Sequence, residues 1–150
     1  MDVWNSITDM SWDYGRLDYM PALPDDLQSL EFGHPFNQSL ANTSLPIGLR
    51  VLKFGWLFNQ SLVYRSLPSG LRTLTFGMHF NHSLDNVTLP GGLHNLTFDV
   101  DFNQSLDNTT LPSGLQTLTF GEPGNPSVDN LALPGTLQTL TFGLLSLIHI

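Results

Sequence analysis

The 150-residue sequence contains no cysteine and little charge. Without cysteine, neither a disulfide framework nor a zinc–thiolate site can form. Charged residues make up 12% of the chain, well below the ~25% of an ordinary soluble domain, so Asn, Gln, Ser and Thr must supply most of the solvated surface. Lysine and arginine number 5 against 13 acidic residues, which gives a net charge of −8. Because nucleic acids and anionic membranes bind cationic surfaces, we expect neither as a partner.

The sequence also lacks a long hydrophobic run. No stretch approaches the ~20 apolar residues that a membrane-spanning helix requires. The first residues carry acids where a secretory signal has positive charge, and they contain no continuous apolar segment. These absences predict a cytoplasmic protein without a transmembrane segment.

What the sequence does contain is repetition with a period of 22 residues. The pentapeptide Phe-Asn-Gln-Ser-Leu occurs at 36–40, 58–62 and 102–106, and at 80–84 it returns with His82 in place of glutamine. Leucine followed by proline recurs at the same step, at Leu23, Leu45, Leu67, Leu89, Leu111 and Leu133. A phenylalanine column is formed by Phe32, Phe54, Phe76, Phe98, Phe120 and Phe142. Such fixed-period self-similarity indicates stacked supersecondary units.

Each unit combines one short strand pattern with a turn-rich remainder. In residues 115–121, Leu118 and Phe120 alternate with Thr117 and Thr119, which is the pattern of a strand with one buried face. The remainder of the unit is rich in Pro, Gly, Asn, Asp and Ser, which oppose helix and favour turns. One coil buries too little apolar surface to offset its conformational entropy, so we expect the coils to be stable only when stacked.

The Phe-Asn-Gln-Ser-Leu segment is predicted to be a structural corner. Phe36 and Leu40 should point inward in the first such segment. Five asparagines fall in register, at Asn37, Asn59, Asn81, Asn103 and Asn125. Their side-chain amides are placed to hydrogen-bond the backbone of their own turn and of the next coil, ~4.8 Å away. The segment therefore serves stacking in preference to ligand binding.

The complete unit, L-P-x-x-L-x-x-L-x-F-G-x-x-F-N-Q-S-L, resembles the FNIP repeat, a 22-residue relative of the leucine-rich repeat (LRR). The resemblance runs from Leu23 to Phe142. The family corner usually reads F-N-Q-P-L or F-N-I-P-L, and here its proline is replaced at Ser39, Ser61, Ser83 and Ser105. The resemblance implies a mainly β fold: an LRR-like right-handed solenoid with one short parallel strand per 22-residue coil and little or no helix. It also implies a role in protein interaction.

The repeats divide the chain into three parts. Residues 1–22 are not repeat-like, and their aromatic residues Trp4, Trp12, Tyr14 and Tyr19 predict an N-terminal cap over the first apolar layer. The repeat array covers 23–143, as coils 23–44, 45–66, 67–88, 89–110 and 111–132 followed by the partial coil 133–143. Residues 144–150 form a non-repeat apolar tail. We expect an uncapped C-terminal face that promotes end-to-end self-association.

One candidate binding site is a cationic and aromatic window. Four of the five basic residues lie in it, at Arg50, Lys53, Arg65 and Arg72. Trp56 and Tyr64 are nearby, and arginine with aromatic residues is typical of protein-interaction hot spots. The window predicts a site for an acidic protein partner. The alternative is a set of ordinary solvated charges facing Glu31.

A second candidate site is a polar grid on the outward face of the later strands. It consists of Thr73, Thr75, Asn95, Thr97, Thr117, Thr119, Thr139 and Thr141. Threonines repeat at ~6.6–7 Å along a strand and ~4.8 Å between coils, a spacing similar to that of ice-binding solenoids. Threonine is also simply a good residue for an exposed strand, so both interpretations stay open.

Other combinations of polar residues carry less information. His79 and His82 lack a third metal ligand of the usual kind, and the column Asp85, Asp107 and Asp129 lacks the glycine-rich calcium motif. The sequence contains no recognisable nucleophile motif or phosphate loop. We therefore expect no metal, no cofactor and no catalysis. The sequence predicts a non-catalytic scaffold that binds an unknown protein partner through its exposed strand face, with ice binding as the alternative.

Overall fold

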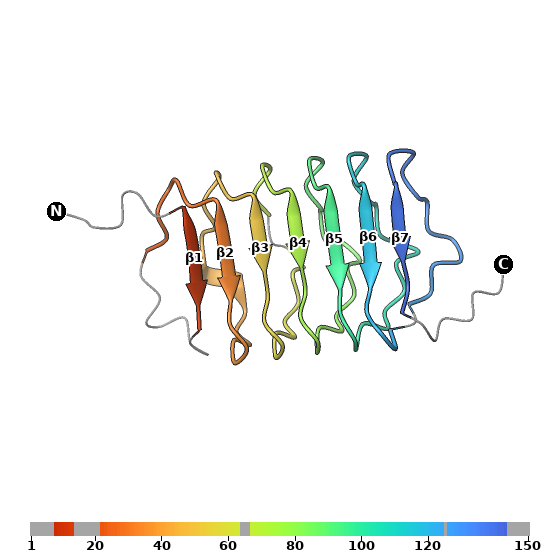
Figure 1. Ribbon diagram of the computed structural model, residues 1–150, viewed down its shortest axis with the longest axis horizontal. Coiled ribbons are helices and arrows are strands. Elements are labelled where there is room, and N and C mark those ends of the chain that lie inside the picture. Colours follow the sequence, from red (N-terminus) through yellow and green to blue (C-terminus); the bar gives the residue numbers. More distant parts are fainter. Residues whose placement is uncertain (1–7, 14–21, 64–66, 125, 144–150) are drawn as a thin grey trace.

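The computed structural model describes residues 8–13, 22–63, 67–124 and 126–143. Within them the chain winds as a β-solenoid whose strands lie side by side in one parallel sheet, as Figure 1 shows. The seven strands follow sequence order: β1 (Asp9–Trp12), β2 (Ser29–Phe32), β3 (Val51–Lys53), β4 (Thr73–Thr75), β5 (Asn95–Phe98), β6 (Thr117–Phe120) and β7 (Thr139–Thr141). The helical content of the described residues is one 3-10 turn, η2 (Leu40–Asn42). The predicted mainly β solenoid is confirmed.

The strand register reproduces the columns of the sequence. Leu52 of β3 pairs with Leu30 of β2 on one side and with Leu74 of β4 on the other. Farther along, Leu96 of β5 pairs with Leu118 of β6. Because each pairing joins residues one period apart, one coil corresponds to one 22-residue repeat.

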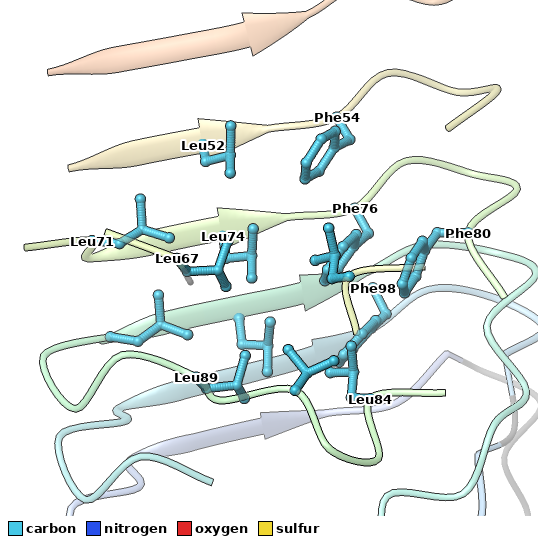
Figure 2. Close-up of a cluster of buried hydrophobic side chains, with 14 of the residues drawn as sticks. Leu52, Phe54, Leu67, Leu71, Leu74, Phe76, Phe80, Leu84, Leu89 and Phe98 are labelled. Carbon is cyan, nitrogen blue, oxygen red and sulfur yellow. The ribbon is translucent and has the colours of Figure 1, made fainter. Parts of the chain in front are cut away.

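Between the sheet and the returning chain lies one continuous core of leucine and phenylalanine. Figure 2 shows Leu74 of β4 and Phe76, which directly follows β4, pointing toward Phe80 and Leu84 of the return segment, and all four side chains are buried. The rings of Phe76 and Phe80 stack with centroids 3.9 Å apart, and Phe76 also stacks on Phe98 of the next coil at 5.3 Å. Since aromatic pairs contribute about 0.5–1.5 kcal/mol beyond the burial of their area, the phenylalanine stack stabilises both the coil and its contact with the next.

The repeated asparagines connect the corners of successive coils. The Oδ1 of Asn37 accepts a hydrogen bond from the backbone N–H of Asn59 at 2.9 Å, and the Oδ1 of Asn59 accepts one from the N–H of Asn81 at 3.0 Å. Asn81 in turn accepts from the N–H of Asn103 at 2.9 Å. The predicted bond from each amide to the backbone of the next coil is confirmed for these residues, whereas Asn125 lies outside the described residues.

The serines that replace the family's proline also have a structural role. Each hydroxyl oxygen accepts a hydrogen bond from the backbone N–H two residues later in the chain. The pairs are Ser39 with Ala41, Ser61 with Val63, Ser83 with Asp85 and Ser105 with Asp107, at 2.9 to 3.2 Å. Such serine turns fix the bend by hydrogen bonding, where proline would fix it through its ring.

The two ends of the array differ from the inner coils. The segment predicted as an N-terminal cap contains β1, whose Trp12 pairs with Phe32 and is buried, so the sheet extends one strand beyond the first leucine–proline repeat. In the last strand, β7, the core-facing Leu140 is 39% exposed because no further described strand covers it. Trp4, Tyr14, Tyr19 and the tail 144–150 lie outside the described residues, and so does the predicted self-association of that tail. No helix in the described part of the chain is long and apolar enough to cross a membrane.

Candidate interaction surface

The outward side chains of the sheet form two straight rows. One row is Ser29, Val51, Thr73, Asn95, Thr117 and Thr139, and the other is Glu31, Lys53, Thr75, Thr97, Thr119 and Thr141. Most of these residues are half-buried from β2 to β6, whereas Glu31, Lys53 and the two threonines of β7 are exposed. Within the first row, Asn95 Nδ2 donates to the hydroxyl of Thr73 at 3.3 Å. The predicted polar grid is therefore present in register, as a regular surface of uncharged hydrogen-bonding groups.

The structure divides the predicted cationic window into two places. Arg50 and Arg72 directly precede β3 and β4, whereas Lys53 ends β3 and Trp56 follows it, so the two arginines lie at the opposite end of the strands from Lys53 and Trp56. Arg65 and Tyr64, the other members of the window, lie outside the described residues.

The two arginines make contacts between coils. Arg50 Nη1 donates to the carbonyl oxygen of Gly70 at 3.5 Å, and Arg72 Nη1 donates to that of Gly92 at 3.1 Å. The same nitrogen of Arg72 lies 3.5 Å from His94 Nδ1. Both arginines are exposed, so their charge still reaches the surface, but each guanidinium also joins one coil to the turn of the next.

Lys53 and Trp56 border a groove at the ends of the strands. This strand-end groove has a volume of about 270 Å³; Gly33, Gly55 and Gly77 line its floor, and Asp13, Glu31, Lys53, Trp56 and Asp99 lie around it. A Cβ atom on Gly55 would overlap the carbonyl oxygen of Gly33, and one on Gly77 would overlap that of Gly55. Close stacking of the coils therefore excludes side chains from this floor, and the groove follows from the packing of the solenoid.

The groove is bordered by an exposed tryptophan. Trp56 is 53% exposed and the adjacent Leu57 is 48% exposed. The ring of His34, one coil earlier, contacts the Trp56 ring edge-on with centroids 4.2 Å apart, which restricts the orientation of the indole. A fixed, half-exposed tryptophan is the kind of residue that dominates the energetics of interfaces. The sequence singled out Trp56 but neither its chain neighbour Leu57 nor His34, which the 22-residue register places beside it.

The charges of the strand face are weakly paired. Lys53 Nζ lies 3.7 Å from Glu31 Oε2, and both side chains are about half exposed, at 47% and 57%. An ion pair this open to solvent contributes little to stability. The Glu31–Lys53 pair therefore leaves both groups accessible to a partner.

Other polar groups join neighbouring coils instead of converging on a site. His79 Nδ1 lies 2.6 Å from Asp101 Oδ2, whereas His82 Nε2 lies 3.1 Å from the carbonyl oxygen of Asn59. The two histidines thus have separate partners, and the described residues contain no group of three potential metal ligands. In the aspartate column, a hydrogen bond from the backbone N–H of Asn130 holds the pKa of Asp107 below its ordinary value.

The parallel strands, stacked leucines and phenylalanines, and asparagine corners together define the class of the protein: a β-solenoid of the leucine-rich-repeat type. The sequence model for the FNIP repeat matches residues 36–79 and 80–123. The chain belongs to the FNIP repeat family.

Comparison with solved structures supports the same fold. The chain is similar to CroV588, whose structure is described as a novel circular LRR protein, with 43% identity over 81% of this chain and a TM-score of 0.74. The chain spans 18% of the length of that protein. Comparison with curated protein sequences gives no match.

Proposed function

We propose that this chain is a non-catalytic repeat scaffold that binds a protein partner through its outward strand face and the adjoining strand-end groove. The observation that carries this proposal is Trp56, a half-exposed tryptophan that lines the groove beside a regular polar face. Tryptophan is enriched among the residues that anchor interfaces. The family and the solenoid fold agree with a scaffold role.

The strand face suits such a partner because it is regular and low in charge. From β4 to β7 its outward side chains are threonines and one asparagine, which can donate or accept hydrogen bonds. A polar face of this kind adds hydrogen bonds around an aromatic anchor without the desolvation cost of buried charges. The arginines at the opposite strand ends, Arg50 and Arg72, extend the surface toward acidic groups of the partner.

A capture experiment with matched variants tests this function. The immobilised chain is exposed to lysate, and bound proteins are compared between the wild type, the strand-face variant Thr97→Glu/Thr119→Glu and the control Thr88→Glu/Thr110→Glu. The control adds the same charge at exposed threonines of the return segments. We expect a bound protein that the strand-face variant loses and the control retains. Equal capture by both variants would contradict the proposal.

The grid of threonines supports ice binding as a second candidate function. The observation that favours this function is the strand register, which aligns Thr117 with Thr139 and Thr119 with Thr141. Thermal hysteresis that Thr117→Lys abolishes would favour this function over protein binding. Absence of hysteresis in the wild type would eliminate it.

A further inference from the structure

We propose that the strand-end groove binds an extended segment of a partner protein that carries arginine or lysine at both ends. This inference rests on the proposed function and specifies the chemistry of the partner. Three features of the groove indicate this ligand: its charge, its length and the position of its aromatic residue.

The charge around the groove is negative. Asp13, Glu31 and Asp99 provide three carboxylates, and Lys53 provides one ammonium group, which is already 3.7 Å from Glu31. The three carboxylates and the one ammonium group give the surroundings two net negative charges, on a chain whose net charge is −8. Such a groove attracts a cationic ligand and repels an acidic one.

The two aspartates without a lysine beside them lie at opposite ends of the groove. In the stacked coils the order is Asp13, Gly33, Gly55, Gly77 and Asp99, because β1 to β5 pair consecutively. Asp13 Oδ1 accepts from Ser11 and Asp99 Oδ1 accepts from the N–H of Val100. In each, Oδ2 has no hydrogen-bond partner among the described residues, which leaves one oxygen at each end for a guanidinium or ammonium group.

The spacing of these aspartates specifies an extended ligand. Four coil steps of ~4.8 Å separate them by roughly 19 Å, which an extended chain spans in about six residues at ~3.3 Å each. The floor between them consists of glycine, so the peptide backbone can approach closely. A compact cation could reach only one aspartate at a time.

Trp56 lies at the middle of this line. Its coil is two steps from that of Asp13 and two steps from that of Asp99. The half-exposed indole offers an apolar contact to the centre of the segment, or a cation–π contact to a basic side chain. A second copy of this chain does not fit the groove, because with 13 acids and only 5 basic residues it is itself anionic.

Fluorescence anisotropy with synthetic peptides tests this inference directly. The probe is a labelled Gly/Ser peptide with a central leucine and two arginines about six residues apart, and the comparison peptide has the same composition with the arginines adjacent. At low ionic strength we expect the spaced peptide to bind the wild-type chain about fivefold tighter than the compact one. Equal affinity for the two peptides would overturn the inference.

Matched variants then locate the binding. We expect Asp99→Asn to weaken the spaced peptide about fivefold, while Asp129→Asn, which removes the same charge from an exposed turn outside the groove, changes affinity less than about twofold. Asparagine at 99 retains the oxygen that accepts from Val100, so the local fold is preserved. Equal weakening by both variants would mean non-specific attraction and would refute the groove site. If the spaced peptide does not bind while the protein captured by the strand face is still bound, this inference is wrong and the proposed function stands.

Discussion

At the scale of single residues, the side chains of the described core are apolar except at one position. Thr109 is the buried polar side chain of the described core, and its hydroxyl oxygen has no hydrogen-bond partner there. One period away on either side lie Val87 and Leu131, in the same local turn: the backbone N–H of each of the three residues donates to the carbonyl three residues earlier. Apolar side chains therefore suit this position, and the hydroxyl of Thr109 is desolvated without compensation.

We predict that Thr109→Val stabilises the chain. Removing a buried, unpartnered hydroxyl should raise the free energy of unfolding by about 1 kcal/mol, measured by urea denaturation. The control is Thr110→Val, at the exposed neighbouring position, which should change stability little. A loss of stability in Thr109→Val would show that the hydroxyl is satisfied in solution.

At the scale of elements, the corner is as important as the strand. Asn81 Oδ1 accepts from the backbone N–H of Asn103 at 2.9 Å and from Gln104 Nε2 at 3.0 Å. One carbonyl oxygen thus satisfies two donors of the next coil. The Phe-Asn-Gln pattern repeats because the phenylalanine fills the core of its own coil while the asparagine binds the following one.

Two substitutions at Asn81 distinguish the contribution of its acceptor oxygen from that of the rest of the side-chain amide. Asn81→Ala leaves the N–H of Asn103 without its partner and should cost about 1–3 kcal/mol in the free energy of unfolding. Asn81→Asp keeps an oxygen at the same place and should cost clearly less. Chemical denaturation at neutral pH measures both. Equal losses would mean that the hydrogen bond to the next coil is not what the asparagine contributes.

Strands, corners and inward columns were predictable because they repeat within the period. The groove was not, for two physical reasons. Met10 pairs with Leu30, a step of 20 residues instead of 22, so a search at the constant period cannot place Asp13 beside Gly33. Conversely, Arg50 and Trp56 are close in sequence but lie at opposite ends of β3, because a strand separates residues that a turn would bring together. The serine turns could not be predicted from the sequence either, since the presence of a serine does not show which backbone N–H its hydroxyl binds.

At the scale of the whole molecule, stability depends on each coil covering the next. Inner coils bury the leucines of their strands completely, as Leu52, Leu74, Leu96 and Leu118 show, whereas the corresponding Leu140 of the last described strand is 39% exposed. The same stacking sets the glycine floor of the strand-end groove and aligns the outward rows. Fold and proposed binding surface therefore have one origin, the packing of the phenylalanine and leucine columns.

The most direct test of this account compares Thr75, the last residue of β4, with Phe76, which follows it and faces the opposite side of the sheet. Phe76 is 1% exposed and stacks on three rings, those of Phe54, Phe80 and Phe98, while Thr75 points outward. Urea denaturation should show that Phe76→Ala lowers the free energy of unfolding by about 3–5 kcal/mol, and that Thr75→Ala changes it by less than about 1 kcal/mol. Similar small losses for both variants would contradict the stacked core.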